Sequence, residues 1–336
     1  MGNVRTGPRV AARATRRLSL GDQSDLEFLG APVAMLTHAF TLCSSSIRHT
    51  SMPQQQVTPP SVSRDDIHTI PDDSFTGRNV CLVTGAGSGI GRATALAAAG
   101  NGLTVAATDV DEAGLEGTVD RAEELGLEGD VEPIAGDLTV DDDIERIVDR
   151  AAELGDIKYL ANVAGVQHID AIEDFPMDTY NRMHGVMLRA PLYLSKLCLP
   201  HFRETEDGEG CVGNMASVHG HYVTSDKVGY NVSKFGLRGL TQSIAAEGEG
   251  AIRSFSISTG YVKTPLVTAQ LEETAEQRGI SVQEVIEDVM LGQARTTEMM
   301  EPIDVGNLFL IGFSDLGRHL NGGDLLFDGG MTLTYE

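Results

Sequence analysis

The sequence lacks tryptophan, and phenylalanine and tyrosine together supply only 5% of its 336 residues. Sandwiches and barrels of short strands are rich in aromatic side chains, so this scarcity disfavours them. Glycine is abundant, at 38 residues, which is typical of folds with many tight turns between strands and helices. The apolar fraction of 41% is enough for a large core. The composition therefore favours a globular α/β protein.

Cysteines and long apolar runs are also scarce. The four cysteines, Cys43, Cys81, Cys198 and Cys211, show no paired spacing, and three of them lie inside apolar runs. We therefore expect structural thiols and no metal site. No apolar run approaches the roughly 18 to 20 residues that a membrane helix needs. The sequence predicts no membrane partner and a cytoplasmic location.

Basic residues are outnumbered, with 25 Lys and Arg against 49 Asp and Glu, which gives a formal net charge of −24. Such a charge repels nucleic acids and anionic membrane surfaces, so we expect neither as a partner. It also destabilises the compact state by self-repulsion, which salt screens. The hypothesis that follows is a protein adapted to a salt-rich cytoplasm.

Residues 1–51 are the exception, because they are rich in Arg and Ser and poor in acids. Such leaders are typical of organelle-targeting peptides, but an acidic, salt-adapted body fits a mitochondrion poorly. We favour the alternative that translation begins at Met52. Residues 1–51 are therefore expected to be disordered or absent from the mature protein. The proline-containing stretch 52–76 is expected to be an irregular acidic linker, and 77–336 the folded domain.

Strand-type and helix-type patterns alternate from residue 79 onward. Strands are predicted over 79–84, 103–108, 131–135, 157–162, 211–215 and 323–327. Helices are predicted over 92–99, 111–125, 140–154, from 177 onward, over 230–247 and over 271–291. This alternation predicts a single domain with a doubly wound parallel sheet, a Rossmann fold. The helical insertion 264–292 near the C-terminus is expected to form a lid or, alternatively, a fixed surface helix pair.

A glycine-rich turn follows the first predicted strand. Gly85, Gly89 and Gly91 lie between that strand and the next predicted helix. Glycine permits positive φ and lets the backbone approach a pyrophosphate, while a helix N-terminus offers unpaired N–H groups. A strand, such a turn and a helix are together typical of dinucleotide sites. We expect this turn, including Ser88 and Ile90, to bind the cofactor.

Polar residues also follow the next predicted strands. Asp109 lies 18 residues beyond Gly91, where a carboxylate accepts hydrogen bonds from ribose hydroxyls and repels a 2′-phosphate, so NAD is favoured over NADP. The alternative is that Asp109 caps the helix over 111–125. The carboxyl ends of parallel strands meet at one edge of a sheet, where ligands bind. Further candidate cofactor contacts at that edge are Asp137, Leu138, Asn162, Ala164 and Gly165.

A serine, a tyrosine and a lysine in the second half can carry proton chemistry. Ser217 follows the fifth predicted strand, and Tyr230 and Lys234 are four residues apart in a helix, so they share one face. A phenol is a poor base at neutral pH, but an ammonium beside it favours the phenolate. Ser217 can donate a hydrogen bond to a carbonyl oxygen as charge develops. The pair could also be a surface pair, but its position in this fold favours catalysis.

These motifs together resemble the short-chain dehydrogenase/reductase family over residues 79–336. The resemblance implies that Tyr230 is the catalytic acid and base and that Ser217 orients the substrate. It also implies that Lys234 holds the nicotinamide ribose and lowers the pKa of Tyr230. Thr264 is a further candidate cofactor contact, and the family resemblance implies a homotetramer that associates through the last strand.

Short segments at 166–169, 172–176, 217–220 and 264–267 also resemble the branch of the family that oxidises (R)-3-hydroxybutyrate with NAD. That resemblance implies that the substrate carboxylate is held by Gln167, His219, Lys227 and Gln270. A short hydroxy acid offers little besides its anion, so an acidic protein must place a cation such as Lys227 locally. Each of the four could instead be an ordinary solvated loop residue.

One position departs from the family pattern. Met187 stands where the family usually has an asparagine that supports a water-linked proton relay, and a methionine side chain cannot donate a hydrogen bond. Thr259 and Met331 are further departures that change the expected pocket shape. Two alternatives therefore stay open: an enzyme acting on a sugar or a longer 3-hydroxyacyl compound, and a non-catalytic NAD-binding protein.

Overall fold

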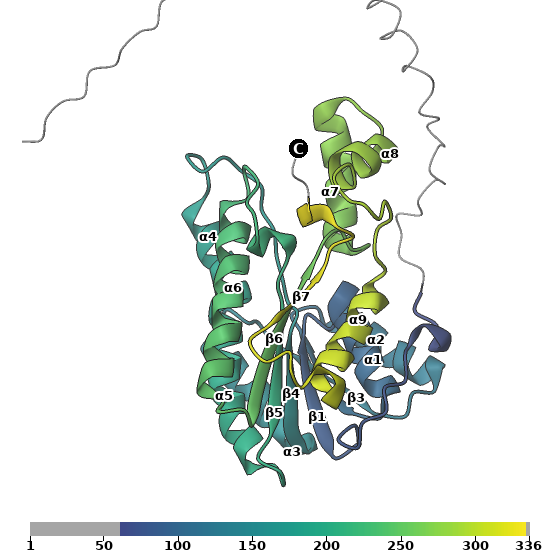
Figure 1. Cartoon of the computed structure of the whole chain (residues 1–336), viewed down its shortest axis with the longest axis vertical. Coiled ribbons are helices and arrows are strands. Elements are labelled where there is room, and N and C mark those ends of the chain that lie inside the picture. The colour runs from purple at the N-terminus through teal and green to yellow at the C-terminus, as the bar shows by residue number, and fades with distance from the viewer. Residues whose placement is uncertain (1–60, 334–336) are drawn as a thin grey trace, which may run out of the picture. The chain divides into compact units, whose positions relative to one another are not determined.

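The computed structural model describes residues 61–333, apart from the side chains of Glu273 and Gln277. Seven strands form one sheet in the order β3-β2-β1-β4-β5-β6-β7 (Figure 1). They are β1 (Asn79–Thr84), β2 (Thr104–Asp109), β3 (Val131–Ala135), β4 (Asp156–Asn162), β5 (Gly210–Met215), β6 (Ile252–Thr259) and β7 (Asp324–Phe327). All neighbours pair in parallel. The predicted doubly wound Rossmann fold is confirmed, with β7 at one edge.

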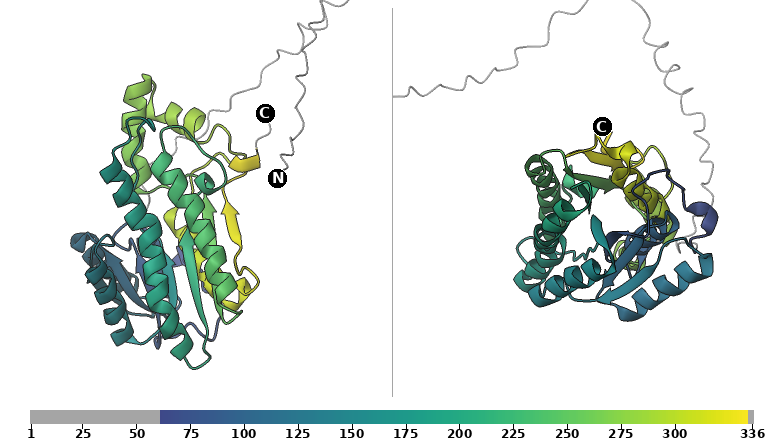
Figure 2. Two further views of the ribbon diagram at one scale, coloured as in Figure 1. Left: turned by 90° about the vertical axis from the view of Figure 1, so that its left-hand side faces the viewer. Right: turned by 90° about the horizontal axis from the view of Figure 1, so that it is seen from below.

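The helices cover both faces of the sheet, which is why its strands read as continuous apolar runs. They are α1 (Gly89–Gly100), α2 (Glu112–Leu125), α3 (Asp141–Leu154), α4 (Met177–His184), α5 (Ala190–Glu204), α6 (Val228–Glu247), α7 (Pro265–Arg278), α8 (Val282–Glu284) and α9 (Pro302–Phe313). Helices α1, α2 and α9 pack on one face, and α3, α5 and α6 on the other (Figures 1 and 2). Two separate apolar cores result, one on each side of the sheet.

Several elements differ from the sequence prediction. Strand β6 and helix α9 had no predicted counterpart. Helix α6 begins at Val228, two residues before Tyr230, so Lys227 is its N-terminal capping residue. The capping residue of α2 is Asp111, so Asp109 does not serve as the helix cap that the sequence allowed.

The irregular stretch before β1 packs onto the folded body. Within residues 61–76 the only helical turn is a short one at Arg64–Asp66. Ile67 and Ile70 are buried in the core on the α1 and α9 face. The side chain of Asn307 in α9 donates to the Asp66 carbonyl at 2.9 Å. These contacts attach the described part of the predicted linker to the domain, while the predictions for residues 1–51 fall outside the described residues.

The predicted insertion is helical and lies beyond the carboxyl ends of the strands (Figure 2). It contains α7, α8 and a π-helical turn at Val285–Met290. Leu271, Val285 and Ile286 form a small core of their own with Val218 and Met331. The segment therefore packs against the loop that follows Ser217, and its role as a lid stays a prediction.

Three of the predicted structural thiols are confirmed. Cys81, Cys198 and Cys211 are buried and unpaired. Burial raises the pKa of Cys198 to about 12, so this thiol stays protonated and unreactive at neutral pH. Cys43 falls outside the described residues. Within residues 61–333, no helix is long and apolar enough to cross a membrane.

The packing of α1 against α9 depends on a close backbone approach. A Cβ placed at Gly306 in α9 would lie 2.8 Å from the Ala93 carbonyl oxygen in α1. Backbone atoms cannot move aside cheaply, so we expect Gly306→Ala to destabilise the fold by about 1 to 3 kcal/mol. Gly239→Ala in α6 is the matched control, because nothing lies within 4 Å of its Cβ position.

We expect Gly239→Ala to be neutral or to stabilise by up to about 1 kcal/mol, through helix propensity. Urea unfolding of both variants in the same salt measures the difference. Equal changes in the two would contradict the close α1 and α9 contact.

Candidate active site

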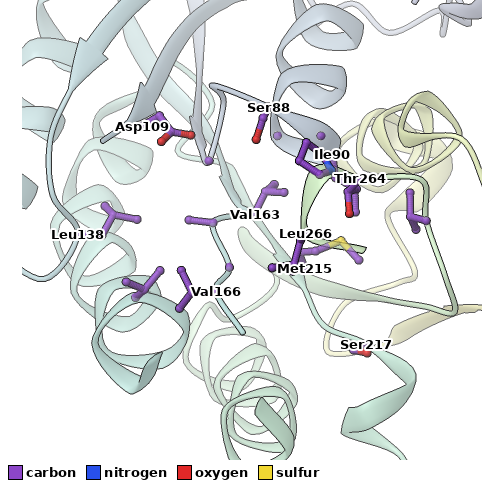
Figure 3. A pocket seen from close by; sticks show the side chains of 18 of the residues that line it. Ser88, Ile90, Asp109, Leu138, Val163, Val166, Met215, Ser217, Thr264 and Leu266 are labelled. Carbon is purple, nitrogen blue, oxygen red and sulfur yellow. The ribbon is translucent and has the colours of Figure 1, made fainter. Parts of the chain in front are cut away.

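A cavity of about 320 Å³ opens at the carboxyl edge of the sheet (Figure 3). The loops that follow β1 to β6 enclose it. Asp109 and Ser217 lie on opposite sides of it in the close view. The predicted residues that line it are Gly85, Ser88, Gly89, Ile90, Gly91, Asp109, Asp137, Leu138, Ala164, Gly165, Ser217, Tyr230, Lys234 and Thr264. The structure thus brings the predicted catalytic residues and all of the predicted cofactor residues except Asn162 to one cavity.

The glycine turn after β1 leaves no room for a side chain at Gly85 or Gly91. Gly85 has a φ of +71°, and its Cβ would lie 2.9 Å from Ala164 Cα. A Cβ at Gly91 would lie 2.0 Å from the Gly85 carbonyl oxygen. The hydroxyl oxygen of Thr84 accepts hydrogen bonds from the amides of Val163 and Ala164, at 2.9 and 3.1 Å. The turn is therefore held against the β4 loop, and the N-terminus of α1 faces the cavity, as a pyrophosphate site requires.

Asp109 is positioned to accept further hydrogen bonds. Its carboxylate accepts the Gly87 amide at 3.0 Å and the Asp111 amide at 3.1 Å, and it lines the cavity. The nearby Arg92 guanidinium donates to the carbonyls of Gly87 and Gly114 and to the Thr118 hydroxyl. Arg92 is committed to these acceptors, so the acid is left to bind hydroxyl donors such as those of a ribose.

Asn162 does not line the cavity. Its side chain is buried, and its amide nitrogen donates to the Asn214 side-chain oxygen in β5 at 2.9 Å. Asn214 in turn donates to the Thr241 hydroxyl in α6 at 2.9 Å. The structure therefore places Asn162 in a buried network that joins β4, β5 and α6.

The ammonium of Lys234 is buried beside Tyr230, the predicted catalytic tyrosine. Its Nζ donates to the Met215 carbonyl oxygen at 2.6 Å and lies 5.3 Å from the centre of the Tyr230 ring. Burial lowers the pKa of Lys234 to about 8. Burial raises the pKa of Tyr230, and a hydrogen bond with Ser217 acts in the opposite direction without cancelling the rise. The effect of Lys234 on the Tyr230 pKa thus stays a prediction from the family resemblance.

His219 is buried next to Ser217, the predicted catalytic serine, and both of its ring nitrogens have polar neighbours. Its Nδ1 lies 3.4 Å from Ser217 Oγ, and its Nε2 lies 3.0 Å from Thr224 Oγ1. Burial, with smaller contributions from the charges of Lys227 and Lys234, lowers the pKa of His219 to about 4. The ring is therefore neutral at pH 7.

Lys227 is a half-buried cation at the start of α6. Among residues 61–333, no hydrogen bond or ion pair engages its Nζ, although the chain contains 49 acidic residues. Burial lowers the pKa of Lys227, and its charge acts on His219. An uncompensated cation of this kind favours an anionic ligand.

The two glutamines predicted to join this group lie on different segments. The side-chain nitrogen of Gln167 is buried without a hydrogen-bond partner. Its loop approaches the start of α6, where the Asp170 amide donates to the Asp226 carbonyl at 2.8 Å. Gln270 lies on α7 and is half-buried, and no contact described for residues 61–333 joins it to the other three. The structure places the Gln167 loop beside the start of α6, where Lys227 lies, and the charge of Lys227 acts on His219.

Met187 is buried in the wall next to Tyr230. It lies in a π-helical turn at Gly185–Arg189, between α4 and α5. It forms an apolar cluster with Phe175 and Met183, against which Tyr230 packs. The usual polar relay position is therefore occupied by an apolar side chain.

Sequence reasoning missed part of the cavity wall. The additional lining residues include Val110, Arg182, Val186, Met215, Thr259 and Val262. Thr259 ends the buried strand β6, which had no predicted counterpart, and the sequence had already marked this residue as one that changes the pocket shape. Arg182 and Val186 are four residues apart, so they face the cavity from one helix side. Thr224, the partner of His219, carried no sequence signal.

Comparisons with known proteins agree with this geometry. A family model described as enoyl-(acyl carrier protein) reductase matches residues 85–332. D-beta-hydroxybutyrate dehydrogenase of Rhizobium meliloti is 33% identical, over 75% of this chain and 97% of that protein. The 3-oxoacyl-[acyl-carrier-protein] reductase of Thermotoga maritima is 30% identical, over 76% of this chain and 98% of its own length.

A solved structure shows the same similarity. The crystal structure of levodione reductase superimposes with a TM-score of 0.71 at 28% sequence identity. The match covers 78% of this chain and all of that one.

The low pKa of His219 predicts how stability depends on pH. The unfolded chain binds a proton near pH 6.5 and the folded protein near pH 4, so stability falls as pH drops through this window. We expect this group to remove about 3 kcal/mol between pH 7 and pH 4. Comparing urea unfolding of the wild type and His219→Gln across these pH values isolates the contribution of His219 to the pH dependence of stability. Parallel pH profiles for the two proteins would contradict the buried neutral histidine.

Proposed function

Because the chain belongs to the short-chain dehydrogenase/reductase family, we propose that it reversibly oxidises (R)-3-hydroxybutyrate, or a close short 3-hydroxy acid, to the keto acid with NAD. The family makes the protein an oxidoreductase. The half-buried Lys227, which no acid among the described residues neutralises, carries the proposal for a carboxylate substrate. Similarity to a D-beta-hydroxybutyrate dehydrogenase supports the choice of acid.

The substrate carboxylate binds at the start of α6. Lys227 supplies the charge, and the buried, unpartnered amide of Gln167 supplies a hydrogen-bond donor from the neighbouring loop. A cation that is shielded from water binds an anion more strongly than an exposed one does. Gln270 approaches from α7 if the helical insertion closes as a lid over the bound acid.

The reacting carbon of the substrate lies in the cavity, next to Tyr230, which lines it. Tyr230 accepts the proton of the substrate hydroxyl, and Ser217, its hydrogen-bond partner, donates to the same oxygen as the carbonyl forms. The cofactor, when bound, supplies the hydride acceptor. Lys234 holds its charge beside the phenol and favours the phenolate.

NAD rather than NADP fits the other end of the cavity. Asp109 lines that end, and its carboxylate repels a 2′-phosphate. The turn from Gly85 to Gly91 offers the backbone cradle that a pyrophosphate needs. The same residues fit any dinucleotide with free ribose hydroxyls.

A second candidate substrate is a longer 3-hydroxyacyl compound. The similarity to a 3-oxoacyl-[acyl-carrier-protein] reductase favours it. Such a substrate carries a thioester in place of the free carboxylate, so it would make no use of an uncompensated Lys227.

The proposal also covers the salt conditions in which the enzyme works and its oligomeric state. The net charge of −24 suits a salt-rich cytoplasm, because screening relieves self-repulsion. The edge strand β7 exposes Leu326 and Phe327, and it is the surface through which a homotetramer would associate. Activity that is highest in dilute buffer and lost in molar KCl would contradict the salt adaptation.

The substrate and the base are tested with one assay. In high KCl, the wild type should reduce NAD with (R)-3-hydroxybutyrate and not with the (S) enantiomer. Tyr230→Phe should lower kcat at least about a hundredfold, because the proton acceptor is lost. NAD binding, measured by calorimetry, should be retained in this variant. Turnover that survives in Tyr230→Phe would overturn the assignment of the base.

The carboxylate site is tested by removing its charge. Lys227→Met should lower kcat/KM for (R)-3-hydroxybutyrate about 10- to 100-fold, as expected for a lost charge-assisted hydrogen bond. The preference for the acid over its uncharged methyl ester should disappear as well. Lys196→Met on the surface of α5 is the control, and it should change neither quantity. An unchanged preference in Lys227→Met would favour the longer acyl substrate.

A further inference from the structure

The short turn that follows β5 carries two of the predicted site residues. It is a 3-10 helical turn at Val218–Gly220, capped by Ser217, whose hydroxyl accepts the His219 amide at 3.2 Å. The Gly220 amide donates to the Ser217 carbonyl at 2.8 Å. A single helical turn is unfavourable in isolation, because it fixes many dihedral angles for few hydrogen bonds. The positions of Ser217 and His219 therefore depend on contacts that hold the turn from outside.

The turn is held from two sides. On the α6 side, the Arg238 guanidinium donates to the Gly220 carbonyl at 2.6 Å. On the sheet side, His221 directly follows the turn, and its Nε2 lies 2.9 Å from Asp324 Oδ2. A carboxylate only accepts hydrogen bonds, so the imidazole is the donor. The turn is thus fixed between helix α6 and the edge strand β7.

Asp324 is a rigid acceptor for this contact. It is the first residue of β7 and is in register with Ser256 on β6. Its Oδ1 accepts hydrogen bonds from the hydroxyls of Ser256 and Ser258, and its side chain is only 12% exposed. Both carboxylate oxygens are therefore held in place, and the contact with His221 is made to the body of the sheet.

An edge strand offers another explanation for the acid. A poorly exposed charge on an edge strand hinders pairing with the edge of another chain. That role requires a charge but no particular partner. It does not account for the His221 ring, which is itself mostly covered and directed at the same carboxylate. The cluster of one imidazole, one carboxylate and two hydroxyls fits an anchor better than an edge charge alone.

We propose that His221 is a positioning residue, which fixes Ser217 at the cavity and His219 beside it by anchoring their turn to Asp324. The inference rests on the proposed dehydrogenase function. Ser217 lines the cavity and His221 does not, so His221 acts through the turn. A displacement of about 1 Å in a group that contacts the reacting atoms can lower the rate about a hundredfold.

Two substitutions separate the hydrogen bond from the volume of the ring. His221→Phe keeps a ring but removes the donor, whereas His221→Gln retains an N–H group that can reach Asp324. His319→Phe, at an exposed position, is the control for an added phenylalanine. Thermal unfolding first establishes that all three variants are folded. They are then assayed in high KCl with NAD and (R)-3-hydroxybutyrate, and NAD binding is measured by calorimetry.

The anchor predicts that His221→Phe lowers kcat about tenfold, while His221→Gln and the control stay close to the wild-type value. The dissociation constant of NAD should be unchanged, because the cofactor residues lie on other loops. Asp324→Ala removes the acceptor and should reproduce the loss of kcat. The double variant of His221→Phe and Asp324→Ala should lose no more than either single one, as expected for two partners in one contact.

A Ser217→Ala background distinguishes positioning from general destabilisation. In that background His221→Phe should cost nothing further in kcat, because the hydroxyl that the anchor positions is gone. A loss of kcat through general destabilisation would persist there.

Hydrogen exchange gives a second readout that does not depend on the substrate. The amides of Gly220, His221 and Tyr222 are hydrogen-bonded within the turn. Removing the anchor should let the turn open more often, so His221→Phe should speed amide exchange in residues 217–222 at least about tenfold. Exchange there should stay at the wild-type rate in His221→Gln and in the control.

Three kinetic outcomes would overturn the anchor. They are wild-type kcat in His221→Phe, equal losses in His221→Phe and His221→Gln, and the same fractional loss from His221→Phe in the Ser217→Ala background. Unchanged exchange of residues 217–222 in His221→Phe would refute it as well. Failure of the proposed function is seen separately, because the wild type itself would then not reduce NAD with the acid, and hydrogen exchange would still decide whether the anchor exists.

Discussion

Backbone contact between the β1 turn and the β4 loop is the constraint on which the site depends. Gly85 approaches Ala164, and Gly91 approaches Gly85, so closely that a methyl group at either position would collide with backbone. This contact places the N-terminus of α1 at the carboxyl end of β1, which has β2 on one side and β4 on the other. The cavity, Asp109 on one side and Tyr230 on the other are arranged around it. The chemistry therefore depends on two glycines that carry no functional group.

The fold and the centre of the site could be predicted from sequence because local signals carry them. The apolar run of β1 and the glycines after it define a strand, a turn and a helix without reference to the rest of the chain. Tyr230 and Lys234 are neighbours through helix geometry alone. Strand β6 was missed because its serine and threonine residues interrupt the apolar pattern, although all but Arg253 are buried in the structure.

The remaining features depend on tertiary contacts that no spacing reveals. The sequence predicted that Asn162 contacts the cofactor, but its side-chain amide donates a hydrogen bond to Asn214 on the neighbouring strand. The partner of His219 is Thr224, an exposed loop residue. Lys227 has no acidic partner among the described residues, and this too depends on where the fold places their side chains. Burial, which raises the pKa of Tyr230, likewise follows from packing.

Lys227, Tyr230 and Lys234 all belong to the α6 segment, and this has a geometric consequence. A helix rises about 1.5 Å per residue, so the backbone positions of Lys227 and Tyr230 are about 4.5 Å apart along the helix axis. In the proposed reaction, the helix sets the distance between the bound carboxylate and the Tyr230 hydroxyl. Selectivity for the position of the hydroxyl group then comes from backbone pitch, which side-chain substitutions in the pocket leave unchanged.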